Sequence, residues 1–403
     1  MKKMIGLLLA MVLVMGILAG CSKKNANENA DASQPSETGI STDATAIVVP
    51  GNNIGKESGV AAITDDGYEL STALVNYYYV DYVKNTYQNI MNYYGESYFS
   101  YIGLDIYTPL NTQYYQQPQT WAAYFLELAL EKAAEDRLLY DLATRENFQL
   151  PEEKVQSVLG IIQSVENYAA MAAYASPDAY LEAVYGAGAT FESYKLYVEL
   201  TTVADAYYYA YADAIVLTEE ELTQYGEEYF SDYSDTQYVA NVRHLLVAFE
   251  GGVTDSMGGT YYSEEEKATA KGEAEMLLFA WQSGAATEDS FISMVQEFTD
   301  DPGSKETGGF YGDIHTESPY VEAFLNWSVD PARKAGDTGI VETEYGYHIM
   351  YFSGYGTMTH RDFLADEQLR QEKLEEWYVG LVENIVVTTV NTQNLMLDMV
   401  MAG

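Results

Sequence analysis

Histidine, aspartate and cysteine side chains can take part in chemistry. The 403 residues include only four histidines and one cysteine. His244 is followed by Leu-Leu-Val in a strand-like segment, and His348 lies in a second such segment. Asp301 opens an Asp-Pro-Gly-Ser sequence that is typical of a turn. A neutral imidazole has one donor and one acceptor nitrogen, so two linked imidazoles could tune a hydrogen-bond network without ionising. Considered one at a time, these residues are also explained by buried structural histidines and an ordinary turn.

The N-terminal segment has the three parts of an export signal. Lys2-Lys3 is followed by an apolar run and then by small residues. The run is too short, and too soon followed by polar residues, for a membrane span. A cysteine directly after Leu18-Ala19-Gly20 resembles the lipobox of bacterial lipoproteins, in which the cysteine is diacylated. We therefore expect residues 1–20 to be a signal peptide and Cys21 to be lipidated. The rest of the chain would be extracytoplasmic and anchored to the bacterial cell membrane; an uncleaved N-terminal anchor is the alternative.

The composition excludes several classes of function. A formal net charge of −41 argues against binding to nucleic acid, whose phosphates need Lys and Arg. Lipidation of Cys21 would leave no thiol for a disulfide, a metal or a nucleophilic step. The spacing of His, Asp and Glu residues is not that of a metal site. We therefore expect no metal and no cofactor.

Tyrosine is unusually frequent, with 38 residues and runs such as Tyr77-Tyr78-Tyr79. Its ring packs with apolar groups while its hydroxyl stays polar, so tyrosine suits a surface that binds varied polypeptides. Tyrosine that fills ordinary helix cores is an equally open alternative.

The chain divides into segments of different character. Residues 21–62 are mostly small and polar, which predicts a disordered tether. Residues 63–237 show helical periodicity and helix-start signals such as Thr218 followed by Glu221, which predicts an all-α domain. Residues 238–356 alternate short strand-like and helical segments, which predicts a small α+β module.

The last segment, residues 357–403, has one apolar helical face. A single helix cannot bury such a face by itself. We therefore expect it to return and pack on the first helical domain, so that the α+β module is an insertion. The expected fold class is α+β.

Four sequence features between residues 238 and 356 together resemble the parvulin family of peptidyl-prolyl isomerases. They occur in the family's order and spacing: Arg243-His244-Leu245-Leu246-Val247, Asp301-Pro302-Gly303-Ser304, Gly308-Gly309 and Tyr345-Gly346-Tyr347-His348-Ile349. The flanking helical segments and the lipobox resemble PrsA-type foldase lipoproteins and, more distantly, SurA-like chaperones.

The resemblance implies an active site. It places His244 and His348 as a facing pair and Asp301 beside the substrate carbonyl. It implies a proline-binding wall made of Phe324, Tyr320 at a position where methionine is usual, and Tyr311 at a position where leucine is usual. His315 and His360 have no matching position, and we expect them on the surface.

Two functions follow from this interpretation. The first is a membrane-anchored isomerase of X-Pro bonds that helps newly secreted polypeptides to fold. The second is a non-catalytic chaperone that uses a degenerate parvulin domain as a binding platform for unfolded polypeptides. A solute-binding lipoprotein is a weaker alternative, because its repeated βαβ units are absent from the sequence pattern.

Overall fold

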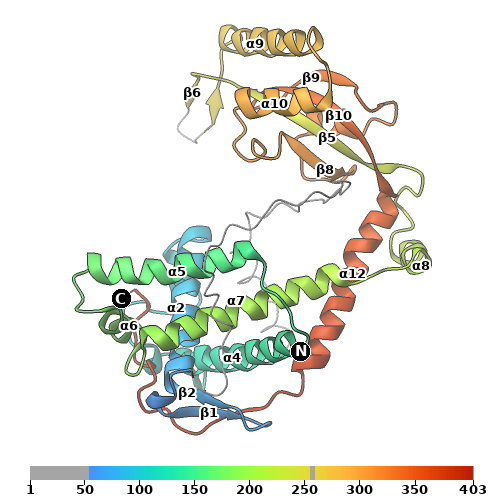
Figure 1. Ribbon diagram of the computed structural model, residues 1–403. Coiled ribbons are helices and arrows are strands. Elements are labelled where there is room, and N and C mark those ends of the chain that lie inside the picture. Colours follow the sequence, from blue (N-terminus) through green and yellow to red (C-terminus); the bar gives the residue numbers. More distant parts are fainter. Residues whose placement is uncertain (1–53, 255–258, 403) are drawn as a thin grey trace, which may run out of the picture. The chain divides into compact units, whose positions relative to one another are not determined.

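A computed structural model describes residues 54–254 and 259–402 (Figure 1). By its contacts the chain divides into two compact units. One, the helical unit, contains the described residues up to Ala214 and those from Trp377 onward; the other, the sheet unit, contains those from Ile215 to Glu376. The predicted fold class, α+β, is confirmed. The predicted signal peptide, Cys21 and most of the predicted tether lie outside the described residues.

Long helices form the core of the helical unit. Helices α2, α4 and α6 each begin where a Ser or Thr side chain accepts a hydrogen bond from the first turn, as Ser71 does from the amide of Leu74. Tyr77 and Phe125 are among the largest side chains that are fully buried between them. Helix α4 lies alongside both α2 and α7 (Figure 1). The helices are α2 (Thr72–Tyr93), α3 (Ser97–Tyr101), α4 (Trp121–Arg145), α5 (Glu152–Met171), α6 (Pro177–Tyr185) and α7 (Phe191–Ala214), with the short turns η1 (Lys56–Ser58) and η2 (Leu110–Thr112).

The helical unit is not purely helical as expected. It contains a three-stranded antiparallel sheet of order β11-β1-β2 and a two-stranded hairpin. The part of the predicted tether from Ile54 onward is ordered, because Ile54 is buried and residues Ala61 and Ala62 are buried in β1. Strands this short show no clear hydrophobic period. The strands are β1 (Val60–Thr64), β2 (Glu69–Ser71), β3 (Tyr114–Gln116), β4 (Gln119–Thr120) and β11 (Val387–Thr389).

The sheet unit is built on a four-stranded antiparallel sheet of order β8-β5-β10-β9. Its helix α9 begins with a capping box, in which Ser263 and Glu266 bond to each other's backbone amides. The elements are α8 (Glu219–Tyr229), β5 (Tyr238–Ala248), β6 (Val253–Thr254), β7 (Thr260–Tyr261), α9 (Glu264–Gln282), α10 (Glu288–Phe298), β8 (Phe310–Ile314), α11 (Glu322–Ser328), β9 (Thr338–Glu342), β10 (Gly346–Thr359) and the part of α12 (His360–Val382) that precedes Trp377.

The two faces of this sheet bury different side chains. Leu245 and Ile349 belong to the core that α9 and α10 complete. Val242 and Met350 lie in the core of the opposite face, together with Phe324 of α11. This alternation decides which face carries the candidate site.

The boundaries of the two units differ from those expected from the sequence. Helix α8 belongs to the sheet unit, where its Tyr225 hydroxyl donates to Glu372 of α12 at 2.5 Å. From Trp377 onward the chain belongs to the helical unit, and there the Trp377 ring stacks on Tyr211 with centroids 3.7 Å apart. Whether the expected segments fold independently stays a prediction.

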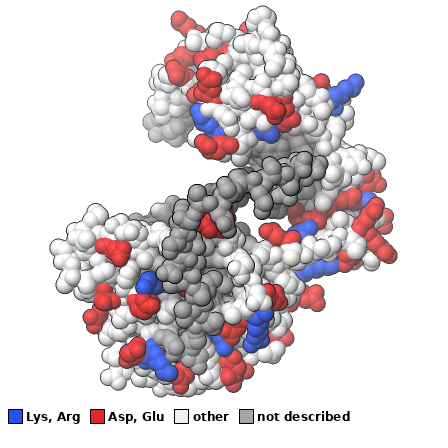
Figure 2. Space-filling view, in the orientation of Figure 1, with Lys and Arg blue, Asp and Glu red and all other residues white. Residues whose placement is uncertain are grey.

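Two features describe how the surface and the helices relate to solvent and membrane: the distribution of charge, and the length of the apolar helices. Asp and Glu side chains are spread over the visible face of both units, with Lys and Arg side chains among them (Figure 2). Among the described residues, the helices are too short or too polar to cross a membrane.

Candidate active site

Strand register places His244 and His348 on the same face of the sheet. In the antiparallel pair β5–β10, His244 lies opposite Met350 and His348 lies opposite Leu246. Residues two apart on a strand share a face, so the two imidazoles lie diagonally across neighbouring strands. Both side chains are buried, and their ring centroids are 5.1 Å apart.

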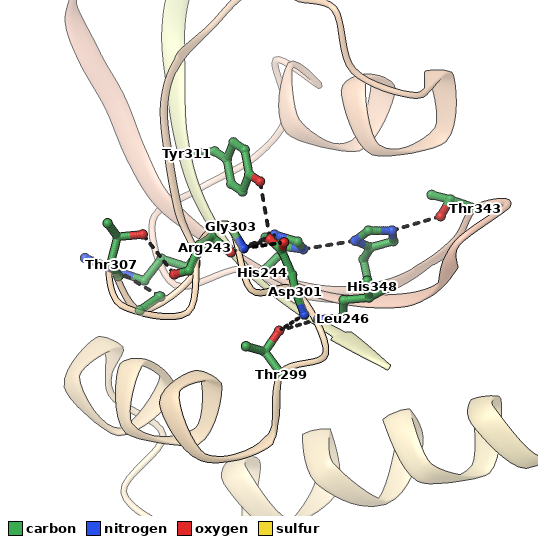
Figure 3. Close-up of polar contacts among 12 residues, drawn as sticks. Arg243, His244, Leu246, Thr299, Asp301, Gly303, Thr307, Tyr311, Thr343 and His348 are labelled. Carbon is green, nitrogen blue, oxygen red and sulfur yellow. Dashed lines mark hydrogen bonds and ion pairs between the residues drawn. The ribbon is translucent and has the colours of Figure 1, made fainter. Parts of the chain in front are cut away.

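The two histidines and Asp301 form a continuous line of hydrogen bonds (Figure 3). Nδ1 of His244 lies 2.9 Å from Nδ1 of His348, and Nε2 of His244 lies 3.0 Å from Oδ2 of Asp301. At the other end of the line, Nε2 of His348 is 2.8 Å from Oγ1 of Thr343. The structure thus brings together the three residues expected to be catalytic; their catalytic role stays a prediction.

Asp301 reaches His244 from the loop that follows α10. The amide of Asp300 donates to the carbonyl of Leu246 at 2.9 Å, which ties this loop to β5. The Thr299 hydroxyl oxygen accepts hydrogen bonds from the amides of Leu246 and Asp301. The amide of Gly303 donates to Oδ1 of Asp301 at 3.0 Å, a local turn that aspartate favours. The position of the carboxylate is therefore fixed by the backbone on both sides.

The far end of the loop requires glycine. Gly309 has φ +74°, and a Cβ atom there would lie 2.1 Å from the carbonyl oxygen of His244. Only glycine combines this backbone conformation with such a close approach. The amide of His244 donates to the Gly309 carbonyl at 2.9 Å, so the Gly308-Gly309 pair places the loop directly against the strand of His244.

Asp301 accepts several hydrogen bonds through one oxygen. Besides His244, the hydroxyl of Ser304 donates to Oδ2 at 2.6 Å and the hydroxyl of Tyr311 donates to it at 3.3 Å. The hydrogen bond from His244, assisted by those from Ser304 and the Gly303 amide, holds the pKa of Asp301 well below its usual range, although partial burial opposes this. Asp301 is therefore an ionised acceptor.

An ionised Asp301 fixes the protons along the line. A carboxylate only accepts, so Nε2 of His244 carries a hydrogen, and in the neutral ring Nδ1 is then an acceptor. Nδ1 of His348 must donate to it, which leaves Nε2 of His348 to accept from the Thr343 hydroxyl. These positions are assigned from the hydrogen-bond partners. Burial, and next the neighbouring His244, lowers the pKa of His348 to about 4, so that the His348 ring is neutral at pH 7.

An aromatic cluster covers the same face of the sheet. Phe324 is buried and meets His244 and His348 edge to face, with centroids 5.4 Å and 5.6 Å apart. Tyr311 and Tyr320 pack on Phe324 at 5.9 Å and 5.4 Å, and on each other at 5.5 Å. The three residues expected to form the proline-binding wall therefore lie together beside the histidines; their contact with substrate stays a prediction.

Two members of this network were not singled out from the sequence. Ser304 is buried and touches both Asp301 and Nε2 of His244, at 2.6 Å and 3.2 Å. Its only signal was its place at the end of the Asp-Pro-Gly-Ser sequence. Thr343 had the weaker signal of lying beside the turn before His348.

The expectation for the other two histidines was wrong for His360, which is buried. It is the first residue of α12, directly after β10, and its backbone amide donates to the carbonyl of Gln237. The ring stacks on His315 at 4.4 Å, and Tyr233 packs on it edge to face. The rings of His315 and Tyr233 therefore cover the His360 side chain.

Comparison with known proteins finds a family similarity in the sheet unit. Residues 230–353 match the family described as PPIC-type PPIase domain, and all of them belong to the sheet unit. The match spans all three predicted catalytic residues and the aromatic cluster.

The relatives are foldases. The chain is 25% identical over 209 residues to the foldase protein PrsA of Clostridium botulinum strain Langeland, which is 50% of this chain and 54% of that protein. The chain thus spans about half the length of the curated relatives it matches. Similar solved structures include PrsA from Bacillus subtilis (16% identity, 70% of this chain and 93% of that chain, TM-score 0.35) and from Streptococcus pneumoniae (14%, 72% and 86%, TM-score 0.29). The predicted resemblance to PrsA-type foldases with a parvulin domain is confirmed.

Proposed function

We propose that this chain is a peptidyl-prolyl isomerase that speeds cis–trans isomerisation of X-Pro bonds and so assists the folding of secreted polypeptides. The observation that supports this most is the line of hydrogen bonds from Asp301 through His244 to His348, with Phe324 packed against both imidazoles. The polar line and the apolar wall lie on one face of the sheet. They would complement the two parts of an X-Pro amide, its polar carbonyl and its apolar proline ring.

The reaction needs no nucleophile and no cofactor. Rotation about a peptide bond faces a barrier of roughly 18–20 kcal/mol, and X-Pro bonds isomerise in tens to hundreds of seconds without a catalyst. A catalyst must bind the twisted amide more tightly than either planar form. Twisting ends the resonance between nitrogen and carbonyl, so the charge on the carbonyl oxygen changes, and preorganised dipoles can favour that state.

The residues then have distinct roles. Phe324, Tyr320 and Tyr311 would hold the proline ring and leave the preceding carbonyl free to rotate. Asp301 would stay ionised beside that carbonyl, and its charge fixes the tautomers of His244 and His348. Neither imidazole needs to gain or lose a proton during the rotation.

The partners and location follow from the rest of the chain. The clients would be unfolded or newly secreted polypeptides held by the helical unit, in which several tyrosines, such as Tyr101 and Tyr168, are exposed. Lipidated Cys21 would anchor the protein outside the cytoplasm, and nucleic acid would not bind. Cys21→Ala should abolish fatty-acid labelling of the protein in cells; labelling that survives the change would contradict the anchor.

The decisive experiment is a proline-isomerisation assay on the chain from residue 22 onward, with X-Pro peptides and with a protein whose refolding is limited by proline. Acceleration by the wild type that is lost in Phe324→Ala would support the isomerase. A protein that suppresses aggregation of an unfolded client but accelerates no X-Pro peptide would instead support the non-catalytic chaperone.

A further inference from the structure

Tyr311 departs from the pattern of the resemblance, in which leucine is usual at this position. The ring does what a leucine side chain would do, because it packs on Phe324 and Tyr320 as part of the aromatic cluster. Its hydroxyl does something that leucine cannot. It lies 3.3 Å from Oδ2 of Asp301, on the side of the carboxylate away from the backbone loop (Figure 3).

The hydroxyl completes the donor set of one oxygen atom. Oδ2 of Asp301 accepts from Nε2 of His244, from Ser304 and from Tyr311, while Oδ1 accepts from the Gly303 amide. Ser304 and Gly303 belong to the same loop as Asp301, whereas Tyr311 lies on β8. Tyr311 therefore ties the carboxylate to the sheet by a second bond besides that of His244.

We propose that Tyr311 is a positioning residue, whose hydroxyl orients the Asp301 carboxylate toward His244 and thereby fixes the tautomers of both histidines. The role rests on the proposed isomerase function and adds a residue to it. Tyr311 keeps its proton and donates a hydrogen bond to the carboxylate, because desolvation and the adjacent Asp301 raise the pKa of Tyr311 to about 12. It is thus a neutral donor throughout the working pH range.

The clean test is Tyr311→Phe, which keeps the ring on Phe324 and removes only the donor. A hydrogen bond to a charged group is worth enough that its loss should lower kcat/KM about tenfold. The loss should fall on kcat with KM nearly unchanged, because the aromatic wall remains. The matched control is Tyr355→Phe, which removes a hydroxyl that donates across the same 3.3 Å to the Asp330 carbonyl, outside the site. It should leave kcat/KM unchanged.

A double-mutant cycle separates positioning from a structural effect. If the hydroxyl acts through the carboxylate, Tyr311→Phe should cost nothing further in an Asp301→Ala background. An equal loss in both backgrounds would overturn the proposal. So would a wild-type rate in the single variant.

A titration gives a readout that does not depend on activity. The groups that face the Asp301 carboxylate are His244 from β5, Ser304 from the loop and Tyr311 from β8, with His348 one step further along the line. Losing a donor should move the carboxyl titration of Asp301, followed by 13C NMR, to higher pH in Tyr311→Phe but not in Tyr355→Phe. A wild type without isomerase activity would contradict the proposed function, and an unmoved titration would contradict this role of Tyr311.

Discussion

Two carboxylates, Asp136 in the helical unit and Asp301 in the sheet unit, have similar partners but opposite properties. Asp136 accepts a hydrogen bond from the Tyr78 hydroxyl at 2.8 Å and is paired with Lys132. Asp301 accepts from the Tyr311 hydroxyl and from His244. Burial raises the pKa of Asp136 to about 6, whereas hydrogen bonds hold the pKa of Asp301 well below its usual range.

The difference lies in how much water each carboxylate loses. The Asp136 side chain is 1% exposed, so desolvation outweighs the favourable effect of Lys132 and Tyr78. The Asp301 side chain is 18% exposed and gains donors from a side-chain network and a backbone amide. Tyr–Asp pairs therefore have two different roles in this chain. In the helical unit the pair satisfies a buried polar group, and in the sheet unit the tyrosine is one of several donors to an ionised carboxylate.

The largest effect is expected from Phe324→Ala, which tests whether the aromatic side of the sheet-unit site matters more than its polar side. Removing a buried aromatic side chain costs about 3–5 kcal/mol in a core, so kcat/KM should fall by roughly 100-fold or more. The control is Phe279→Ala on α9, where the ring is 71% exposed. Circular dichroism should show that both variants are folded. Isomerase activity that survives in folded Phe324→Ala would show that the aromatic cluster is not the proline site.

Asp301→Ala should have the next largest effect. It removes a charged partner worth roughly 1–3 kcal/mol to the network and should slow isomerisation about 10- to 100-fold at pH 7. Asp300→Ala is the matched control, because the neighbouring carboxylate accepts from the Ala248 amide at 2.9 Å instead. Equal rates in the two variants would mean that the charge of Asp301 plays no part in catalysis, whatever its place in the hydrogen-bond line.

The sequence predicted the sheet unit better than the small sheet of the helical unit. Residues 238–356 were expected to alternate short strands and helices, and this range holds α9, α10 and α11 and nearly all of the four-stranded sheet. β10 runs to Thr359, beyond the expected end of the module at residue 356. β11 could not be foreseen, since its stability comes from pairing Thr389 with Ala62, more than 300 residues away.

The site shows the same limit at the level of side chains. Its three predicted catalytic residues came from the order of motifs, and the register of β5 and β10 then explains why the two histidines meet. The hydroxyl partners Ser304 and Thr343 depend on where a loop and a turn fold back, which no local pattern reports. The burial of Asp136 was likewise invisible, because lysine and aspartate four residues apart usually mark an exposed helix face.

Acidification should affect the two units in opposite directions. The folded-state pKa of Asp136, about 6, lies above its ordinary 3.8, so its contribution to stability is present below pH 4 and lost as pH rises through 6. The pKa of His348, about 4, lies below its ordinary 6.5, so its contribution is present above pH 6.5 and lost as pH falls through 4. Between pH 7 and 5, α4 should therefore gain stability and β10 should lose it.

Hydrogen exchange, corrected for the intrinsic pH dependence, would measure these changes separately for peptides of α4 and of β10. Asp136→Asn should remove the pH dependence of stability from the helical unit only. His348→Gln should remove it from the sheet unit only. Isomerase activity should follow β10, because a protonated His348 also carries a hydrogen on Nε2 and can no longer accept from the Thr343 hydroxyl. If acidification changed the stability of α4 and of β10 in the same direction, the pKa values of Asp136 and His348 would not be set by burial and hydrogen-bond donors as described.

The smallest effect is expected from Tyr78→Phe, the counterpart in the helical unit of Tyr311→Phe. The Tyr78 hydroxyl donates to a buried carboxylate, so its loss should lower the free energy of unfolding of the helical unit by about 1–3 kcal/mol and leave kcat/KM unchanged. The adjacent Tyr79 is the control, because its buried hydroxyl has no hydrogen-bond partner in the described part of the chain. Tyr79→Phe should therefore cost nothing or stabilise. The same chemical change would then lower stability but not activity at Tyr78. At Tyr311 it would lower activity but not stability. Denaturation and isomerase assays on Tyr78→Phe and Tyr311→Phe would measure the two properties. If either variant lost both stability and activity, the two hydroxyls would not have different roles in the two units.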